Sequence, residues 1–175
     1  MNYARMEEQL ILHEGLKLTP YLDSEGFWTV GVGYNVSARG WQAFEQVVGR
    51  PVSHLFDPEA PQPLLTRDEA LRVLRADIAR VEQAVRTYLP EYDTLDDVRQ
   101  RVVVDLAFNL AYRALGFKRA IAALKRRDWS GVARELWDSR WSRQVGDGPG
   151  KKRDRADRLT QMVLTGHDYV GTDIA

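Results

Sequence analysis

The sequence has no cysteine among its 175 residues and only three histidines. The lack of cysteine excludes disulfides, a thiol nucleophile and thiolate metal sites, and it leaves the redox compartment open. The histidines are scattered, and no HExxH pattern occurs, so the sequence predicts no catalytic metal. Nothing in it indicates another cofactor.

Long hydrophobic runs are also missing. No apolar run approaches the roughly 18–20 residues that a membrane span needs. The N-terminal stretch MNYARMEEQLILHEG carries acids among its apolar residues, which is typical of neither a signal peptide nor an anchor. We therefore expect no stable insertion into a membrane.

The formal net charge is zero, but its distribution is uneven. From Val98 to the C-terminus there are 16 Lys and Arg residues against 9 Asp and Glu residues. The ordinary interpretation of this basic surplus is that the charged residues lie on solvated helix faces. The more specific interpretation is a basic lobe that attracts an anionic polymer, such as nucleic acid or cell wall. The basic residues are spread over several predicted helices without a recognised DNA-binding motif, so we expect no nucleic-acid partner.

Apolar periodicity predicts a helix at about residues 2–14, which Gly15 ends. A β-hairpin around the turn residues DSEG follows, and FWTVGVGYN reads as one strand with Thr29, Gly31 and Gly33 on a nearly bare face. The next segment is irregular, with a short helix around residues 42–48. A capping box at Thr66 then opens a helix of about 22 residues that Pro90 ends.

The second half is predicted to be helical. Its central helix, around VVVDLAFNLAY, is apolar nearly all round. Two polar residues, Asp105 and Asn109, share one face of that helix and need partners if they are buried. They could be structural or could line a cleft. The sequence thus predicts an α+β, mostly helical fold: a small α+β lobe, a long helix and a helical lobe.

The stretch HEGLKLTPYLDSEGFWTVGVGYN brings together groups suited to glycosidic hydrolysis. That reaction needs a proton donor for the leaving oxygen and a carboxylate that activates water or attacks the sugar. Glu14 lies at a predicted helix C-terminus, where the helix dipole disfavours negative charge, and Asp23 lies at the hairpin turn. Thr29, on the bare face, could hold a water molecule.

This stretch resembles the catalytic region of the phage-type lysozymes, glycoside hydrolase family 24. The family pattern is Glu, eight residues, Asp, five residues and Thr, followed by a Gly-x-Gly strand. Glu14, Asp23, Thr29, Gly31 and Gly33 stand at those spacings. Further segments are similar to the family along nearly the whole chain, in the order LTRDEALRVLRADI, TLDDVRQ, LAFNLA, GFKRAIAALKRRDW, SRW and RADRL.

The resemblance implies that Glu14 is the general acid and that Asp23 and Thr29 handle the water, with inversion at the anomeric carbon. It implies substrate contacts at Gly33, Phe108, Asn109, Gln144 and Arg155. The substrate would be peptidoglycan, cut at the β-1,4 bond between N-acetylmuramic acid and N-acetylglucosamine.

The resemblance also implies one lysozyme-like domain over residues 1–175. Its lobes would span about 15–77 and 78–175, with helix 2–14 packed on the second lobe. The role implied is that of a monomeric bacteriophage endolysin, an antibacterial hydrolase that waits in the host cytoplasm for a holin and then acts on the cell wall in the periplasm. A tail-associated enzyme and a prophage-derived bacterial protein are alternatives.

Other activities stay open. A lytic transglycosylase or a chitinase-like hydrolase would use the same fold, and an inactive cell-wall-binding module would use no acid. The chain also departs from the family pattern at two positions. Tyr34 replaces the histidine that usually pairs with an acid at the position of Asp77, where a tyrosine hydroxyl could form a hydrogen bond without a positive charge. His13 stands where an acid often precedes the catalytic Glu.

Overall fold

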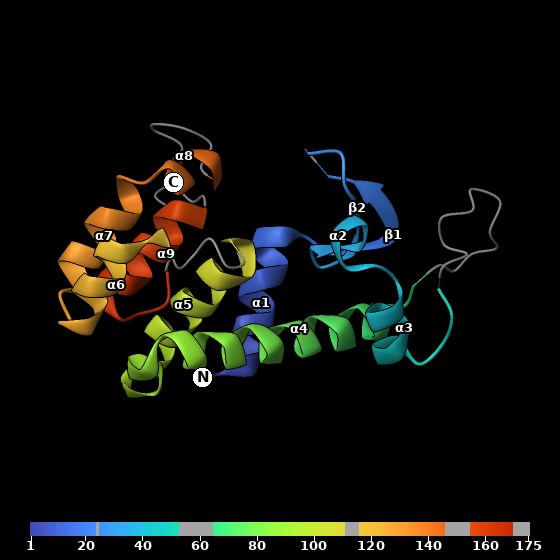
Figure 1. Ribbon diagram of the computed structural model, residues 1–175, viewed down its shortest axis with the longest axis horizontal. Helices are drawn as coiled ribbons and strands as arrows, with labels where there is room; N and C mark the ends of the chain where they lie inside the picture. Colours follow the sequence, from blue (N-terminus) through green and yellow to red (C-terminus); the bar gives the residue numbers. More distant parts are fainter. Residues whose placement is uncertain (24, 53–64, 111–115, 146–154, 170–175) are drawn as a thin grey trace, which may run out of the picture. The chain divides into compact units, whose positions relative to one another are not determined.

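The structure is a computed structural model, which describes residues 1–23, 25–52, 65–110, 116–145 and 155–169. Contacts between residues divide the chain into two compact units. The N-terminal unit is Tyr3–Arg80, and the C-terminal unit is Met1–Asn2 together with Val81–Ala175. The division falls inside the long helix α4, Arg67–Tyr88 (Figure 1). Helix α1, Tyr3–Glu14, groups with the N-terminal unit, and its packing on the second lobe stays a prediction.

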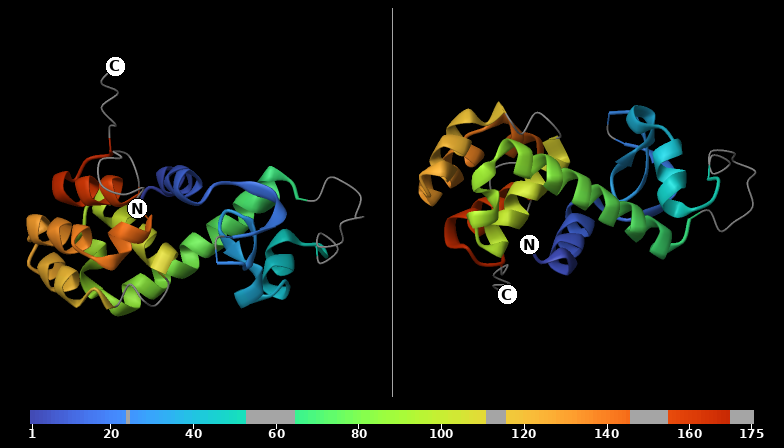
Figure 2. Two further views of the ribbon diagram at one scale, coloured as in Figure 1. Left: turned by 90° about the horizontal axis from the view of Figure 1, so that it is seen from above. Right: turned by 60° about the horizontal axis from the view of Figure 1, so that its bottom comes forward.

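The N-terminal unit holds a small antiparallel sheet in the order β1-β2-β3. Its strands are β1 (Lys17–Leu22), β2 (Trp28–Gly31) and β3 (Tyr34–Asn35). Helices α2 (Val36–Arg39) and α3 (Gln42–Val48) follow and lie beside the sheet in both views of Figure 2. The predicted short helix is therefore confirmed, whereas residues 53–64 of the predicted irregular segment lie outside the described residues.

The prediction of one strand over FWTVGVGYN is wrong, because the chain turns between β2 and β3. Gly31 and Gly33 both have a φ of 67°, a left-handed conformation that side chains other than glycine's rarely tolerate. The two glycines thus make a turn possible. Val30, Val32 and Tyr34 are buried, while Trp28 is 42% exposed.

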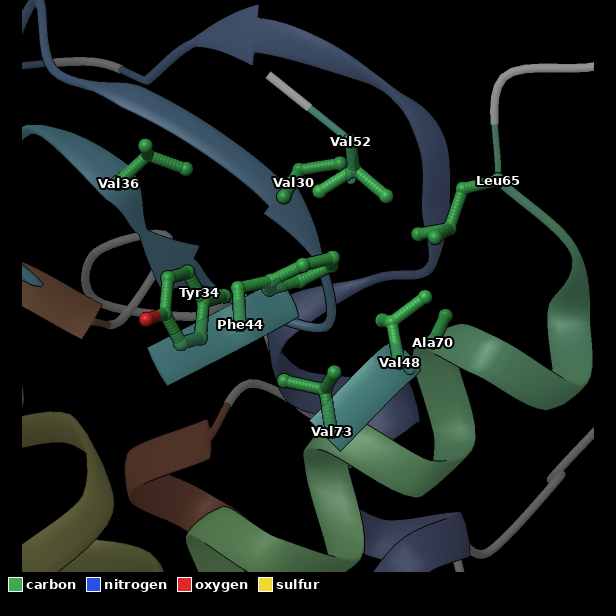
Figure 3. Close-up of a cluster of buried hydrophobic side chains, with 9 residues drawn as sticks. All are labelled: Val30, Tyr34, Val36, Phe44, Val48, Val52, Leu65, Ala70 and Val73. Atoms are coloured by element: carbon green, nitrogen blue, oxygen red, sulfur yellow. The ribbon is translucent and has the colours of Figure 1, made fainter. Parts of the chain in front are cut away.

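The core of the N-terminal unit lies between the sheet, α3 and the first turns of α4. Figure 3 shows its buried side chains, which are Val30, Tyr34, Val36, Phe44, Val48, Val52, Leu65, Ala70 and Val73. The rings of Tyr34 and Phe44 meet edge to face, with 4.9 Å between their centroids, a favoured aromatic geometry. This core fixes the sheet on α4 and thereby positions the hairpin.

The expected hydrogen bond between Tyr34 and Asp77 is not among the bonds of the described residues. The Tyr34 hydroxyl instead donates to the carbonyl of Gly40 at 3.0 Å. The positively charged partner of Asp77 is Arg39, whose guanidinium donates to both carboxylate oxygens at 2.6 Å. The same guanidinium lies 4.0 Å from the centroid of the Tyr34 ring. Tyrosine therefore supplies a surface for the arginine that neutralises Asp77.

The C-terminal unit is helical in its described parts. After α4 come the 3-10 helix η2 (Pro90–Thr94), α5 (Asp97–Leu110) and α6 (Lys118–Lys125). The last three helices are α7 (Trp129–Trp137), α8 (Arg140–Val145) and α9 (Arg155–Thr165). Helix α9 packs against α5, α7 and α8, and α6 packs against α7. The predicted α+β, mostly helical fold is confirmed.

Candidate functional site

The residues of the predicted catalytic set all lie in the N-terminal unit. Glu14 is the last residue of α1, and Gly15 (φ 76°) ends the helix with an amide bonded to the carbonyl of Ile11 at 2.9 Å. Asp23 follows β1, and Thr29 lies in β2. The ends of two elements and one strand thus bring these side chains to the same part of the unit.

Asp23 is fixed by the turn that it begins. Its Oδ1 accepts hydrogen bonds from the backbone amides of Glu25 at 2.9 Å and Phe27 at 2.8 Å. Its own amide donates to the carbonyl of Phe27 at 2.9 Å. A carboxylate held by two amides has a defined orientation, and its Oδ2 is left facing Thr29.

Thr29 is 3% exposed and lies against Asp23. Its hydroxyl is 3.4 Å from Oδ2 of Asp23 and 3.3 Å from the carbonyl of Phe27. Both distances are at the long end of the hydrogen-bond range, and the hydroxyl has one hydrogen to donate. Its lone pairs can accept a hydrogen bond from a water molecule.

Glu14 lies directly against Gly33. A Cβ atom added at Gly33 would be 3.1 Å from Oε2 of Glu14 and 3.4 Å from its Cδ. The missing side chain therefore leaves room for the carboxyl group, in addition to permitting the positive φ of this residue. Glu14 is therefore the group that approaches the Gly33 backbone closely.

Two residues that sequence reasoning missed lie on the same face of the sheet. Tyr21 pairs with Thr29 across the β1–β2 register, and Lys17 pairs with Gly31. The Lys17 ammonium is 3.7 Å from the centroid of the Tyr21 ring. Burial raises the pKa of the Tyr21 phenol, and the nearby charges of Glu14 and Asp23 raise this pKa further. The position of Tyr21, two residues before Asp23 in a strand, was the available signal.

The remaining predicted site residues lie in the C-terminal unit. Asn109, near the end of α5, accepts a hydrogen bond from the indole of the buried Trp141 at 3.0 Å. Phe108 precedes it and is half-buried, while Gln144 is exposed on α8. These positions are described within their own unit, and their contact with substrate stays a prediction.

Arg155 is buried at the start of α9. Its Nε donates to Oδ1 of Asp105 at 2.7 Å, and its Nη2 donates to the backbone carbonyl of Asp105 at 3.3 Å. Asp105 is 0% exposed and Arg155 is 6% exposed. The partner that the sequence demanded for a buried Asp105 is therefore an arginine 50 residues later, and the pair joins α5 to α9.

The described residues contain no group of three or more His, Asp or Glu side chains that could hold a metal ion. Across the same parts of the chain, no helix has both the length and the apolar character for crossing a membrane. The candidate site in the N-terminal unit contains two carboxyl groups, a hydroxyl, a phenol and an ammonium group.

Comparison with known proteins gives a family match over most of the chain. The model of the family described as phage lysozyme matches residues 12–158. "Probable T4-type lysozyme 1" of Dictyostelium discoideum is 23% identical over 172 residues, which cover 93% of this chain and 95% of that protein. "Pre-baseplate central spike protein Gp5" of Enterobacteria phage T4 is 25% identical over 173 residues, which cover 93% of this chain and 28% of that protein.

Proposed function

Because this chain belongs to the phage lysozyme family, we propose that it is a muramidase of peptidoglycan. It hydrolyses the β-1,4 bond between N-acetylmuramic acid and N-acetylglucosamine. The observation that carries this proposal is the arrangement of two carboxyl groups whose charges both reach Tyr21, with Glu14 against Gly33 and Asp23 fixed beside Thr29. Hydrolysis of a glycosidic bond by two carboxyl groups requires such a pair.

Glu14 is the general acid of the proposed reaction. Its carboxyl group gives a proton to the glycosidic oxygen as the bond to the anomeric carbon breaks, so the leaving sugar departs as an alcohol. Gly33 supports this role because a side chain there would press on the carboxyl group, with its Cβ 3.1 Å from Oε2.

Asp23 and Thr29 handle the attacking water. The water oxygen forms a bond to the anomeric carbon on the face opposite the leaving group, and this attack inverts the configuration. The proton that the water loses passes to the Asp23 carboxylate. The two amides on Oδ1 of Asp23 leave Oδ2 for this proton. Thr29 orients the water through a lone pair of its hydroxyl.

Substrate contacts are proposed at Gly33 and, in the C-terminal unit, at Phe108, Asn109, Gln144 and Arg155. The amide nitrogen of Asn109 suits this role, because its carbonyl oxygen already accepts the Trp141 indole. Arg155 forms an ion pair with Asp105, which fixes the orientation of its guanidinium for the proposed contact.

The biological role proposed is that of a phage endolysin. The enzyme would act as a monomer, reside in the host cytoplasm until a holin releases it, and then open the wall and kill the cell. The match to a baseplate spike protein favours a second role as a wall-opening lysozyme of the virion. Mass spectrometry of purified virions separates the two roles, because only the second places the chain in the particle.

The test of activity is clearing of purified Gram-negative peptidoglycan, with mass spectrometry of the products. Wild type should clear the wall and leave reducing N-acetylmuramic acid ends. Glu14→Gln should lower the rate by about 10²–10⁴-fold, whereas Glu8→Gln, an exposed acid on the same helix, should not.

Each alternative activity predicts a different result in this assay. Ends with a 1,6-anhydro ring would identify a lytic transglycosylase, which needs no water and therefore no Asp23. Cleavage of chitin in preference to the wall would identify a chitinase-like enzyme. Wall binding by folded wild type without any cleavage would identify an inactive binding module and refute the proposal.

A further inference from the structure

Two hydrogen-bond donors lie on the face of the sheet that holds Thr29. Residues directly opposite in an antiparallel pair point to the same face of the sheet. Tyr21 therefore shares its face with Thr29, and Lys17 shares the same face with Gly31, since Thr29 and Gly31 are two residues apart. The register irregularity between Lys17 and Tyr21 accommodates the extra residues of β1 and lets the ammonium reach the ring at 3.7 Å.

Neither the Lys17 ammonium nor the Tyr21 hydroxyl donates a hydrogen bond to an acceptor among the described residues. Lys17 is exposed, and there its ammonium forms the contact with the Tyr21 ring and no ion pair. The Tyr21 hydroxyl likewise forms no hydrogen bond to any described group. The raised pKa of Tyr21 keeps this hydroxyl protonated, so it is a donor over the whole working range of pH.

The negative charges of Glu14 and Asp23 reach Tyr21, and the Lys17 ammonium lies over the ring of the same residue. Stacking holds the ammonium at a fixed place through a cation–π contact while leaving its N–H groups exposed. A fixed ammonium with an adjacent phenol hydroxyl is suited to an anionic group that arrives with the substrate.

We propose that Lys17 and Tyr21 bind a carboxylate of the acidic peptide that muramic acid residues carry in peptidoglycan. This inference rests on the proposed function, because it concerns the substrate of the same site. Chitin has no carboxylate, so the pair would favour peptide-bearing wall over neutral glycans. Lys17 and Tyr21 are specificity residues in this account and take no part in proton transfer.

The test compares two soluble substrates that differ in charge. The first is peptidoglycan strands with intact stem peptides, and the second is the same strands with peptide carboxyls converted to methylamides. Wild type should have the lower KM on the intact strands. The ratio to compare is the KM for amidated strands divided by the KM for intact strands. Lys17→Met should lower this ratio by about two- to fivefold, the factor that corresponds to the loss of one exposed ion pair.

Control variants separate this contact from general attraction and from misfolding. Lys17→Arg keeps a cation that can stack on the ring and should keep the ratio. Lys118→Met removes an exposed lysine of the C-terminal unit and should leave the ratio at the wild-type value. Tyr21→Phe, which keeps the ring and loses the hydroxyl, should lower the ratio less than Lys17→Met.

The outcomes distinguish this inference from the proposed function. If wild type cleaves both substrates with the same KM, or if Lys17→Met and Lys118→Met have the same ratio, the Lys17–Tyr21 assignment is wrong and the muramidase stands. If wild type cleaves neither substrate, the proposed function itself fails. A folded Lys17→Met with a wild-type ratio overturns the assignment even when its overall rate is reduced.

Discussion

At the scale of single residues, the nearly buried carboxylate of Asp77 is paired with Arg39. The Asp77 side chain is 5% exposed, and it contacts Arg39 through two hydrogen bonds. Arg80, one helical turn further along α4, lies 3.5 Å from the same carboxylate. The stacking of Arg39 on Tyr34 adds a cation–π contact. This group joins α2 to α4 inside the N-terminal unit.

Arg39→Met should lower the free energy of unfolding by about 3 kcal/mol, because it leaves a nearly buried carboxylate with a weaker partner. This is the low end for a broken buried pair, since Arg80 stays in place and the Arg39 side chain is itself 30% exposed. Urea unfolding at pH 7 measures the change.

Two further variants show whether the unpaired charge is the cause. Asp77→Asn combined with Arg39→Met should be less destabilised than the sum of the single changes. Arg75→Met breaks the exposed pair with Glu7 and should change stability little. Additive effects at positions 39 and 77 would show that the pair does not stabilise the fold.

At the scale of elements, the start of α4 is held by a capping box joined to an arginine. The Thr66 amide donates to Oε2 of Glu69 at 2.7 Å, and the Glu69 amide donates to the Thr66 hydroxyl at 3.2 Å. Arg50 donates to both carboxylate oxygens of Glu69, at 2.6 and 2.9 Å. These bonds satisfy helix-start amides that would otherwise lack partners.

Glu69→Gln should therefore be destabilising at neutral pH and nearly silent in strong acid. The Arg50 hydrogen bonds, followed by those from Thr66, hold the pKa of Glu69 at about 2 against an ordinary value of 4.5. A carboxyl with a depressed folded-state pKa stabilises the fold above its unfolded pKa and loses that contribution as pH falls through the folded value.

Urea unfolding of wild type and Glu69→Gln at several pH values checks this expectation. The difference in unfolding free energy should be full above about pH 5 and should shrink between pH 4.5 and about 2. Asp68→Asn, an exposed acid in the same turn, serves as the control. A difference that is independent of pH would contradict the role of the Glu69 charge.

The elements show how far sequence patterns reach. Helix α4 has the predicted length because its cap, its apolar stripe and Pro90 are all local in sequence. The pairs Arg39–Asp77 and Arg155–Asp105 join residues 38 and 50 positions apart, and no local pattern selects one arginine among many. The glycines near β2 were predicted to lie within one strand, and the turn that they form was missed because Gly-Val-Gly fits both a strand and a bend.

In the candidate site, too, sequence patterns indicate which residues to consider but not all of the contacts between them. Residue types, spacing and the family resemblance predict Glu14, Asp23 and Thr29 as the catalytic residues, and their roles stay a prediction. The contact between Lys17 and Tyr21 depends on strand register, which the irregularity in β1 shifts. The contact between Glu14 and Gly33 depends on the turn after β2. A register with an irregularity cannot be read from alternation alone.

At the scale of the whole molecule, the chain is neutral but strongly asymmetric in charge. The residues from Val98 onward hold 16 Lys and Arg against 9 Asp and Glu. In the described part of the C-terminal unit, Arg126 and Arg134 are exposed and form no ion pair. An anionic wall polymer should be attracted by this surplus, and salt should screen the attraction.

We expect the rate of wall hydrolysis at low substrate concentration to fall several-fold as salt rises from about 50 to about 300 mM. The rate at saturating substrate should change less, because screening acts on binding. Replacing both Arg126 and Arg134 by Gln should flatten the dependence while leaving the melting temperature nearly unchanged. A salt effect of the same size at saturation would assign the effect to the chemical step.

Helix α4 has a consequence for the cooperativity of unfolding. One continuous helix carries Val73 and Leu74 of one unit and Val81 and Val85 of the other, and all four are buried. If one unit unfolded alone, its half of α4 would lose its packing, and isolated helical segments of that length are marginal in water. The loss would fray the helix toward the other unit. The free energies of unfolding of the two units are thus coupled through a shared backbone.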